Sequence, residues 1–369
     1  MNLRGRCHLY IKLCFSSFAL ITLGSIFLLS SSYIYGISAV GNPVYFFQRH
    51  LLWLLLGAAA FLVVNRIDTS RIERYSLPFF IFTIGVLLLP VVFGGLRWIR
   101  LGPFSFQPAE LVKISFLVYL ADYLKRRRSE IVRPRVFIVP IGFLALVTAI
   151  LQFQKDVGTF VVIAITFGVL LFIAGARRKH VAIFGASLVL LFCGLVLLFP
   201  YRLQRIRTYM DPSADPHGAG YQTIQAIIAM GSGGLFGRGL GAGERKLKFL
   251  PEAHKDYVYA VVGEELGLFG TSLVLMFFAI IVFCGFDFAK LAKDDYDKFL
   301  AAGISTLMGV QFLLHAGVVV NLVPAKGTTL PFFSVGGSSL LINIIALGLL
   351  HNIGRKVCFE DPVDSAEPL

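Results

Sequence analysis

Four short polar motifs interrupt an otherwise apolar chain, and they hold most of the side chains that could do chemistry. In residues 250–257, Asp256 closely follows Glu252, His254 and Lys255 and directly precedes a long apolar run. A carboxylate at the end of a membrane helix can accept or orient a hydroxyl proton, as a general base does. The other interpretation is a helix cap or first-turn carboxylate, which is the commoner role at this spacing. Such a carboxylate would be ionised at neutral pH and would be a weak base.

Two further carboxylates, Glu264 and Glu265, follow Asp256 in the same apolar run. A helix rises about 1.5 Å per residue, so a continuous helix would place them roughly 12–13 Å deeper. Carboxylates at that depth need a partner or a wet cavity. Structural pairing and contact with a substrate both stay open.

Two motifs open other apolar segments. Glu110 and Lys113 are three residues apart and share a helix face, which fits an internal ion pair or one end of a polar cavity. Asp156 lies in a short turn between two apolar segments. It is predicted to cap the second of these as a helix, with a place in a substrate site as the alternative.

The fourth motif, residues 324–339, contains two prolines and three glycines together with Lys326, Ser334 and Ser338. This composition predicts a non-helical segment, which a membrane protein tolerates only where it is buried or lines a cavity. Lys326 is expected to face the same compartment as Asp256. A cation and a carboxylate on one face fit recognition of a charged lipid headgroup.

A glycine cluster at residues 231–243 resembles a nucleotide loop only superficially. It lacks the GxxxxGK[ST] pattern and any βαβ context. We interpret it as a tight, flexible turn over the membrane surface. The amphipathic stretch 221–230 before it is expected to lie in the interface plane as a short helix.

The composition identifies the class of protein that must position these motifs. Of 369 residues, 57% are apolar and 15% are charged, which excludes a soluble enzyme, a disordered chain and a disulfide scaffold. The net charge of +13 fits basic cytoplasmic loops better than a nucleic-acid partner, so no nucleic acid is expected. The five cysteines show no metal or disulfide spacing.

The sequence predicts an all-α polytopic membrane protein with about ten transmembrane helices. Twenty Lys and Arg residues fall on one set of loops and five on the opposite set, which places both termini in the cytoplasm. The five are Arg49, Arg97, Arg100, Lys155 and Lys326. The predicted regions are a cytoplasmic N-terminus (1–12), a transmembrane domain (13–356) with a large extracytoplasmic loop between helices 7 and 8 (201–256), and a cytoplasmic tail (357–369). The predicted spans are 13–34, 50–65, 77–95, 110–124, 136–153, 157–176, 180–200, 257–286, 299–323 and 335–353.

Taken together, the motifs resemble the SEDS family (shape, elongation, division and sporulation) over about residues 13–356. The resemblance rests, in order, on FQPAELVK, QKDVGT, GLGAGERKLKFLPEAHKDYVYAVVGEELG and AKGTTLPFFSVGGSS. The third and fourth of these look more like the cell-division branch than the elongation branch. The chain departs from the usual family pattern at Ser105, Lys155, Lys255 and Val335.

This resemblance implies a peptidoglycan glycosyltransferase, a hexosyltransferase that polymerises lipid II. It would act at the outer face of the bacterial cytoplasmic membrane, at the division site, with a class B penicillin-binding protein and other division proteins. Asp256 matches the family's essential aspartate. Lys326 is the first candidate to stabilise the leaving pyrophosphate, followed by Lys113 or the loop residues Arg205, Arg207, Arg238 and Lys246, and Mg²⁺ or Mn²⁺ could share that work.

Two other classes of function stay open. A lipid II flippase would need polar groups along a path across the membrane, whereas an enzyme needs them clustered at the outer face. The motif positions favour the enzyme. A non-catalytic division scaffold is the third interpretation, which the changes at Lys155 and Val335 keep open.

Overall fold

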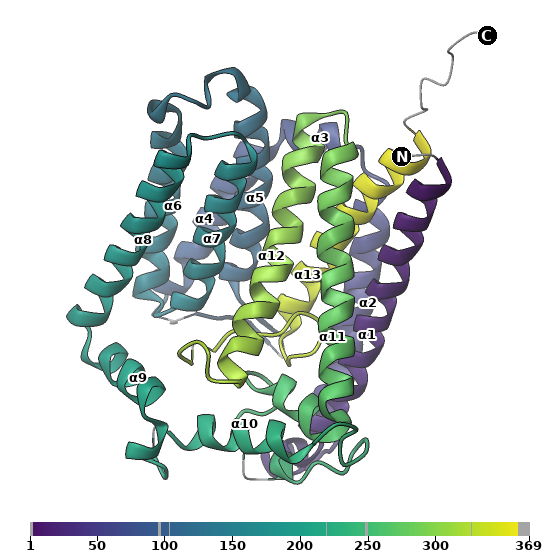
Figure 1. Ribbon diagram of the computed structural model, residues 1–369, viewed down its shortest axis with the longest axis vertical. Coiled ribbons are helices and arrows are strands. Elements are labelled where there is room, and N and C mark those ends of the chain that lie inside the picture. Colours follow the sequence, from purple (N-terminus) through teal and green to yellow (C-terminus); the bar gives the residue numbers. More distant parts are fainter. Residues whose placement is uncertain are drawn as a thin grey trace.

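The computed structural model describes residues 3–94, 97–102, 104–218, 220–247, 250–325 and 327–360, and these fold into a helical bundle with one small β-hairpin (Figure 1). The long helices are α1 (Leu3–Val40), α2 (Tyr45–Val64), α4 (Ser76–Val92), α5 (Pro108–Arg126), α6 (Ile138–Phe153), α7 (Val157–Ile173), α8 (Arg178–Leu198), α11 (Val258–Leu291), α12 (Asp295–Val319) and α13 (Gly337–Arg355). The connections contain α3 (Thr69–Arg74), α9 (Pro200–Met210) and α10 (Tyr221–Ser232). The hairpin pairs β1 (Ile99–Leu101) with β2 (Phe104–Phe106) in antiparallel register.

Each of the ten predicted spans overlaps one long helix. Within the described ranges, seven helices are long and apolar enough to cross a membrane, and α4 and α7 are shorter apolar helices. The remaining predicted span corresponds to α5, which carries buried charged residues. The all-α membrane fold is therefore confirmed, and ten stays the predicted number of spans.

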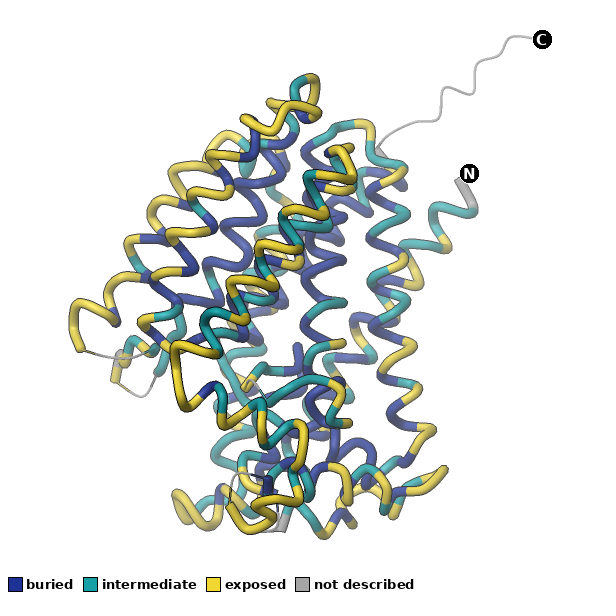
Figure 2. Tube along the Cα trace, turned by 60° about the vertical axis from the view of Figure 1, so that its left-hand side comes forward, coloured by how far each residue is buried: buried dark blue, intermediate teal, exposed yellow. Residues whose placement is uncertain are grey.

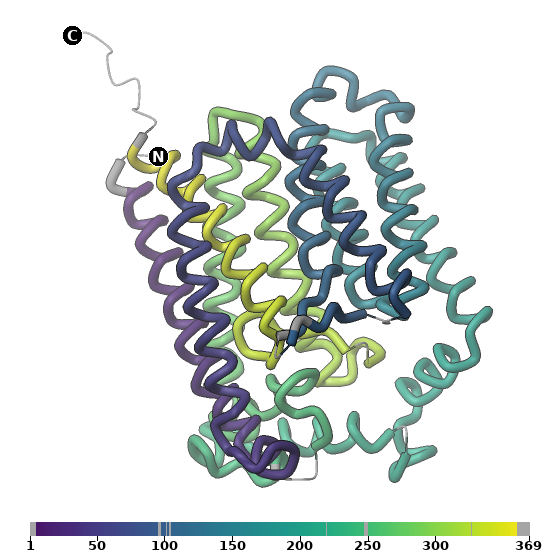
Figure 3. Tube along the Cα trace, turned by 180° about the vertical axis from the view of Figure 1, so that it is seen from behind, coloured from purple at the N-terminus to yellow at the C-terminus, as the bar shows by residue number. Residues whose placement is uncertain are grey.

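The two ends of the described chain lie together. The Arg6 guanidinium donates to the Val357 carbonyl at 3.1 Å, so the start of α1 and the end of α13 share one end of the bundle (Figure 1). Seen from behind, α1, α2 and α13 run side by side (Figure 3).

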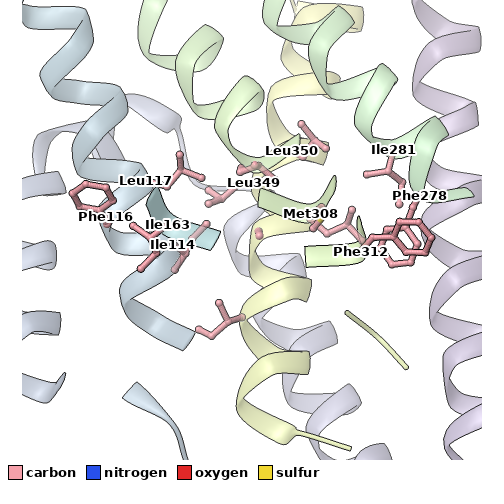
Figure 4. Packing of buried hydrophobic residues seen from close by; sticks show 14 of the residues in the cluster. Ile114, Phe116, Leu117, Ile163, Phe278, Ile281, Met308, Phe312, Leu349 and Leu350 are labelled. Carbon is pink, nitrogen blue, oxygen red and sulfur yellow. The ribbon is translucent and has the colours of Figure 1, made fainter. Parts of the chain in front are cut away.

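Small residues allow the central helices to pack closely. A β-carbon on Gly303 of α12 would lie 2.1 Å from the Leu117 side chain of α5, and one on Gly285 of α11 would lie 1.8 Å from the Ser305 hydroxyl of α12. Such small-residue contacts are the usual way for membrane helices to approach one another. The buried residues gather in the middle of the bundle (Figure 2), where Phe278 and Phe312 stack at 4.7 Å (Figure 4).

At the bundle's edge, α8 packs on α7 and on the following helix α9, and it has no buried residue. Beyond it, the loop predicted at 201–256 is largely folded. It contains α9 and α10, and α10 lies across the end of the bundle (Figure 1). The predicted short helix at 221–230 is therefore confirmed.

The chain folds back within α11. Gly267 has φ +65° and ψ −158°, and the Tyr259 hydroxyl donates to the Thr271 carbonyl at 3.0 Å. In one straight helix these two residues would lie about 18 Å apart along the axis. The prediction that Glu264 and Glu265 lie deeper in one continuous span is therefore wrong. They lie at the reversal and accept backbone hydrogen bonds, which is the structural alternative.

Candidate active site

A cavity of about 570 Å³ lies towards the end of the bundle opposite the two termini, between α2, α5, α7, the hairpin and the segments before α11 and α13. Five of the nine predicted site residues line it, and these are Asp256, Glu252, Glu110, Lys113 and Asp156. The structure thus brings together residues that are up to 146 positions apart in the chain.

Asp256 contributes a carboxylate that faces the cavity. The N-cap of α11 is Tyr257, and the Asp256 side chain caps nothing, so the cap interpretation is wrong. Among the described residues, none donates a hydrogen bond to this carboxylate. Gly327 lies beside it, with room for little more than one added carbon, because a β-carbon there would be 3.4 Å from Asp256 Oδ2.

The surroundings make Asp256 a stronger base than a surface aspartate. Burial raises its pKa to about 6 and the neighbouring Glu252 carboxylate adds to the rise, while Lys255, Arg205 and Arg97 oppose it. The expectation of an ordinary, weakly basic carboxylate is therefore wrong, because desolvation outweighs the nearby positive charges. At pH 7 the group is still mostly ionised and can accept a proton.

Glu110 and Lys113 form the inner wall of the cavity. Their side chains pair at 2.7 Å and are almost fully buried. Lys113 Nζ also donates to Gln311 Oε1 at 2.7 Å, and Gln311 Nε2 donates to Asn343 Oδ1 at 3.2 Å. This network ties α5 to α12 and α13, so both the ion-pair and the cavity interpretations hold.

Asp156 is the N-cap of α7, as predicted. Its Oδ1 accepts from the Thr159 amide at 3.1 Å, and its Oδ2 accepts from the Gln107 side-chain amide at 3.1 Å. The carboxylate is thus largely occupied by structural bonds, although it lines the cavity.

Three predicted residues lie outside the cavity lining. The His254 ring stacks on Tyr35 at 4.2 Å, and burial lowers its pKa to about 4, which leaves it neutral. The Ser334 hydroxyl donates to the Lys255 carbonyl at 2.5 Å. The Ser338 hydroxyl accepts a hydrogen bond from the Gln107 backbone amide at 2.9 Å. Each bond joins two segments of the cavity wall.

Lys326 lies outside the described residues. Its neighbours are placed, however: Gly327 lines the cavity, and the Ala325 carbonyl accepts from Arg205 at 3.3 Å. Of the other loop cations, Arg238 pairs with Glu244 at 2.9 Å. Lys246 pairs with Glu265 at 2.5 Å, also away from the cavity, and Arg207 is exposed.

Three arginines that were not predicted as site residues line the cavity, and these are Arg49, Arg97 and Arg100. Arg97 donates to the carbonyls of Gln154, at 2.7 Å, and Lys155. With Lys113 and Lys255, five basic side chains line the described cavity wall. The sequence does carry a signal for them, because all three arginines belong to the few basic residues that are predicted for the outer face.

The cavity wall also contains three positions at which the chain departs from the usual family pattern. Ser105, Lys255 and Val335 line it. Lys255 places a positive charge in the wall, where it pairs with Glu252 at 2.6 Å. Ser105 and Val335 place neutral side chains at the other two positions.

A protein-only metal site is absent from the part of the chain that the structure describes, where no three His, Cys, Asp or Glu side chains gather. The cavity combines two features. Its Asp256 carboxylate has a raised pKa and receives no hydrogen bond from the described residues, and its basic side chains outnumber its acidic ones. These groups suit a reaction in which a hydroxyl loses a proton and an anionic group leaves.

Comparisons with known proteins agree with this chemistry. The family model described as "Cell cycle protein" (FtsW, RodA, SpoVE) matches residues 11–358. Stage V sporulation protein E of Bacillus subtilis (strain 168) is 36% identical over 344 residues, which cover 91% of this chain and 94% of that protein. A probable peptidoglycan glycosyltransferase FtsW of Coxiella burnetii is 38% identical over 364 residues, covering 94% and 96%.

Two solved structures share the fold. A chain from a peptidoglycan synthase complex, studied for the coordination of polymerization and crosslinking, has a TM-score of 0.77 and 29% identity, and the match covers 95% of this chain and 98% of that one. The rod shape determining protein RodA of Thermus thermophilus has a TM-score of 0.69 and 26% identity, covering 93% and 96%.

Proposed function

The chain belongs to the FtsW, RodA and SpoVE family of cell cycle proteins, and we propose that it polymerises lipid II into glycan strands during cell division. It is a peptidoglycan glycosyltransferase of the membrane. The observation that carries the proposal is the Asp256 carboxylate, which faces a cavity lined by five basic side chains.

The reaction follows from these groups. A hydroxyl of the acceptor sugar attacks the anomeric carbon of the donor, a new glycosidic bond forms, and the bond to the lipid pyrophosphate breaks. Asp256 accepts the hydroxyl proton, which its raised pKa favours. The pyrophosphate leaves with both electrons of the broken bond.

Positive charge must stabilise the leaving pyrophosphate. Arg49, Arg97 and Arg100 line the cavity wall, and Lys326 directly precedes Gly327, which lies beside Asp256. We assign these four side chains to the pyrophosphate. Guanidinium groups suit the pyrophosphate because each can donate two parallel hydrogen bonds to phosphate oxygens. A bound Mg²⁺ or Mn²⁺ would add charge and would take its ligands mainly from the pyrophosphate oxygens.

The proposal includes a partner and a place. Since a structural relative belongs to a peptidoglycan synthase complex, we propose that a class B penicillin-binding protein cross-links the strands made by this chain. Other division proteins would join them. The expected location is the bacterial inner membrane at the division site, with the cavity facing outward.

Polymerisation in vitro tests the proposal. The purified chain, with its partner's transpeptidase site blocked, is given lipid II, and the glycan products are separated on a gel. Wild type is expected to make polymer, and Asp256→Asn none. Glu244→Gln is the matched control, because Glu244 is an exposed carboxylate that pairs with Arg238 outside the cavity.

Each other outcome points elsewhere. Polymer from Asp256→Asn would remove Asp256 as the base. No polymer from a folded wild-type complex would favour a lipid II flippase or a scaffold, and transport of labelled lipid II in vesicles would separate these two.

A further inference from the structure

The glycine-rich segment 231–243 lies outside the lining of the cavity, and hydrogen bonds order it more than its composition suggested. Gly234, Gly237, Gly239 and Gly241 all have positive φ, which only glycine adopts easily. Gly237 packs so closely on the α11 reversal that a β-carbon there would lie 2.1 Å from the Glu265 carbonyl. The segment is therefore an ordered loop with a defined backbone conformation.

Two fully buried carboxylates hold the C-terminal end of this loop and the residues that follow it. Glu265 accepts from the Gly241 amide at 3.0 Å and pairs with Lys246 at 2.5 Å. Glu264 accepts from the amides of Glu244, at 2.9 Å, and Arg245, at 3.1 Å. The loop and the reversal in α11 thus form one unit.

The free side of this unit is apolar. Two backbone hydrogen bonds join the loop to the part of α11 that follows Gly267. The Leu268 amide donates to the Gly234 carbonyl at 2.9 Å, and the Phe269 amide donates to the Leu235 carbonyl at 3.0 Å. The side chains around these bonds are 59–81% exposed. We call them the loop patch, and its members are Leu235, Phe236, Leu240, Leu268 and Phe269.

Two helices place the loop patch relative to the membrane. On α11, Leu268 lies 22 residues before Lys290, the last basic residue of that helix, which is roughly 33 Å. On α1, Ser30 donates to Glu265 at 2.7 Å, and it lies 18 residues after Lys12, which is roughly 27 Å. The hydrocarbon core is about 30 Å thick, so both measures put the patch at its outer boundary.

The loop patch also continues an exposed apolar face of α11. Leu268, Leu275, Met276 and Phe283 are exposed at the spacing of one α11 face. An exposed apolar cluster of this kind is unusual in water but is typical of a membrane contact.

We propose that the loop patch inserts into the lipid interface of the outer leaflet. Its occupant is lipid, in the headgroup and upper acyl-chain region. The anchor holds the helical segment 258–266 at a fixed height, and that segment begins two residues after Asp256. The bilayer itself would thereby set the position of the segment that carries Asp256.

Tryptophan quenching tests this proposal. Phe236 is 81% exposed, so Phe236→Trp should fold as wild type does. Glu244→Trp is the matched control in the same loop, on its polar side. Each variant is placed in nanodiscs of phosphatidylcholine and phosphatidylglycerol whose acyl chains are brominated either near the headgroup or near the bilayer centre. Wild type supplies the background from its two tryptophans.

The expected result is a loss of Trp emission at position 236, larger with bromine near the headgroup than near the centre, and no loss at position 244. Unquenched emission at 236 in active protein would overturn the proposal. Equal quenching at both positions would also overturn it, because the contact would not belong to the patch. If emission at 236 changed only when the penicillin-binding protein was added, the patch would be a protein contact instead.

Discussion

Gly327 faces Asp256 so closely that a β-carbon on the glycine would lie 3.4 Å from the carboxylate oxygen. Gly327 also has φ +63°, a conformation that favours glycine. The segment that carries Lys326 therefore approaches the proposed base through a position where a side chain would contact the carboxylate.

Replacing Gly327 by alanine should impair polymerisation. The methyl group would enter the space beside the carboxylate, and the strained backbone costs about 1 kcal/mol. We expect at least about a tenfold loss of rate, which corresponds to about 1.4 kcal/mol in the transition state. Gly41→Ala is the control, because Gly41 has φ +72° and open space around it. An equal loss in both variants would mean that backbone strain alone is responsible.

The polymerisation rate should fall in mild acid. The proposed mechanism needs ionised Asp256, whose pKa is raised to about 6. Above pH 7 the rate should be nearly constant, and well below pH 6 it should fall about tenfold per pH unit. Initial rates between pH 4.5 and 8.5 measure this, with folding checked at each pH. A midpoint near 4 would show that burial does not perturb the carboxylate.

The helices were predictable because long apolar runs have few alternatives in a membrane. The reversal at Gly267 was not, since one glycine within an apolar run gives no local sign that the chain turns back. The same lack of local information hid the pKa of Asp256. Its position before a helix predicted a dipole-stabilised carboxylate, whereas burial dominates in the fold.

The three cavity arginines were hard to predict for a different reason. In the sequence, Arg49, Arg97 and Arg100 are distinguished only as basic residues of the predicted outer face, yet all three line the cavity. Since the positive-inside rule makes basic residues scarce on that face, those that occur there have another reason to be present. Their convergence could not be read from the sequence, because it depends on how α2 and the hairpin pack.

Removing the Asp256 charge should stabilise the protein at neutral pH. A carboxylate with a raised pKa opposes folding once it ionises, so its cost is fully present above about pH 6 and disappears as the pH falls towards 3.8. The rise of roughly two pH units corresponds to an upper limit of about 3 kcal/mol. Asp256→Asn should therefore melt at a higher temperature than wild type at pH 7.5 and at the same temperature near pH 4. A lower melting temperature at pH 7.5 would contradict this sign.

The buried pair of Glu110 and Lys113 should be needed for stability as a pair. Lys113→Met leaves the Glu110 carboxylate buried without its cation, which typically costs 3–5 kcal/mol. Adding Glu110→Gln should recover most of that loss, because the unpaired charge is removed. Thermal unfolding of the single and double variants in detergent measures both effects. If the double variant were no more stable than the single one, charge burial would not be the cause.

The strongest test of the charge arrangement uses two cavity residues that act on Asp256 with opposite signs. Arg97 lowers the pKa of Asp256 and Glu252 raises it. Arg97→Gln should therefore move the acid limb of the rate profile to higher pH, and Glu252→Gln should move it to lower pH. Both side chains line the cavity, so either change can also alter the maximal rate, but only an electrostatic effect on the base moves the two midpoints in opposite directions. Midpoints that stay fixed in both variants, or shift in the same direction, would mean that the titrating group is not Asp256.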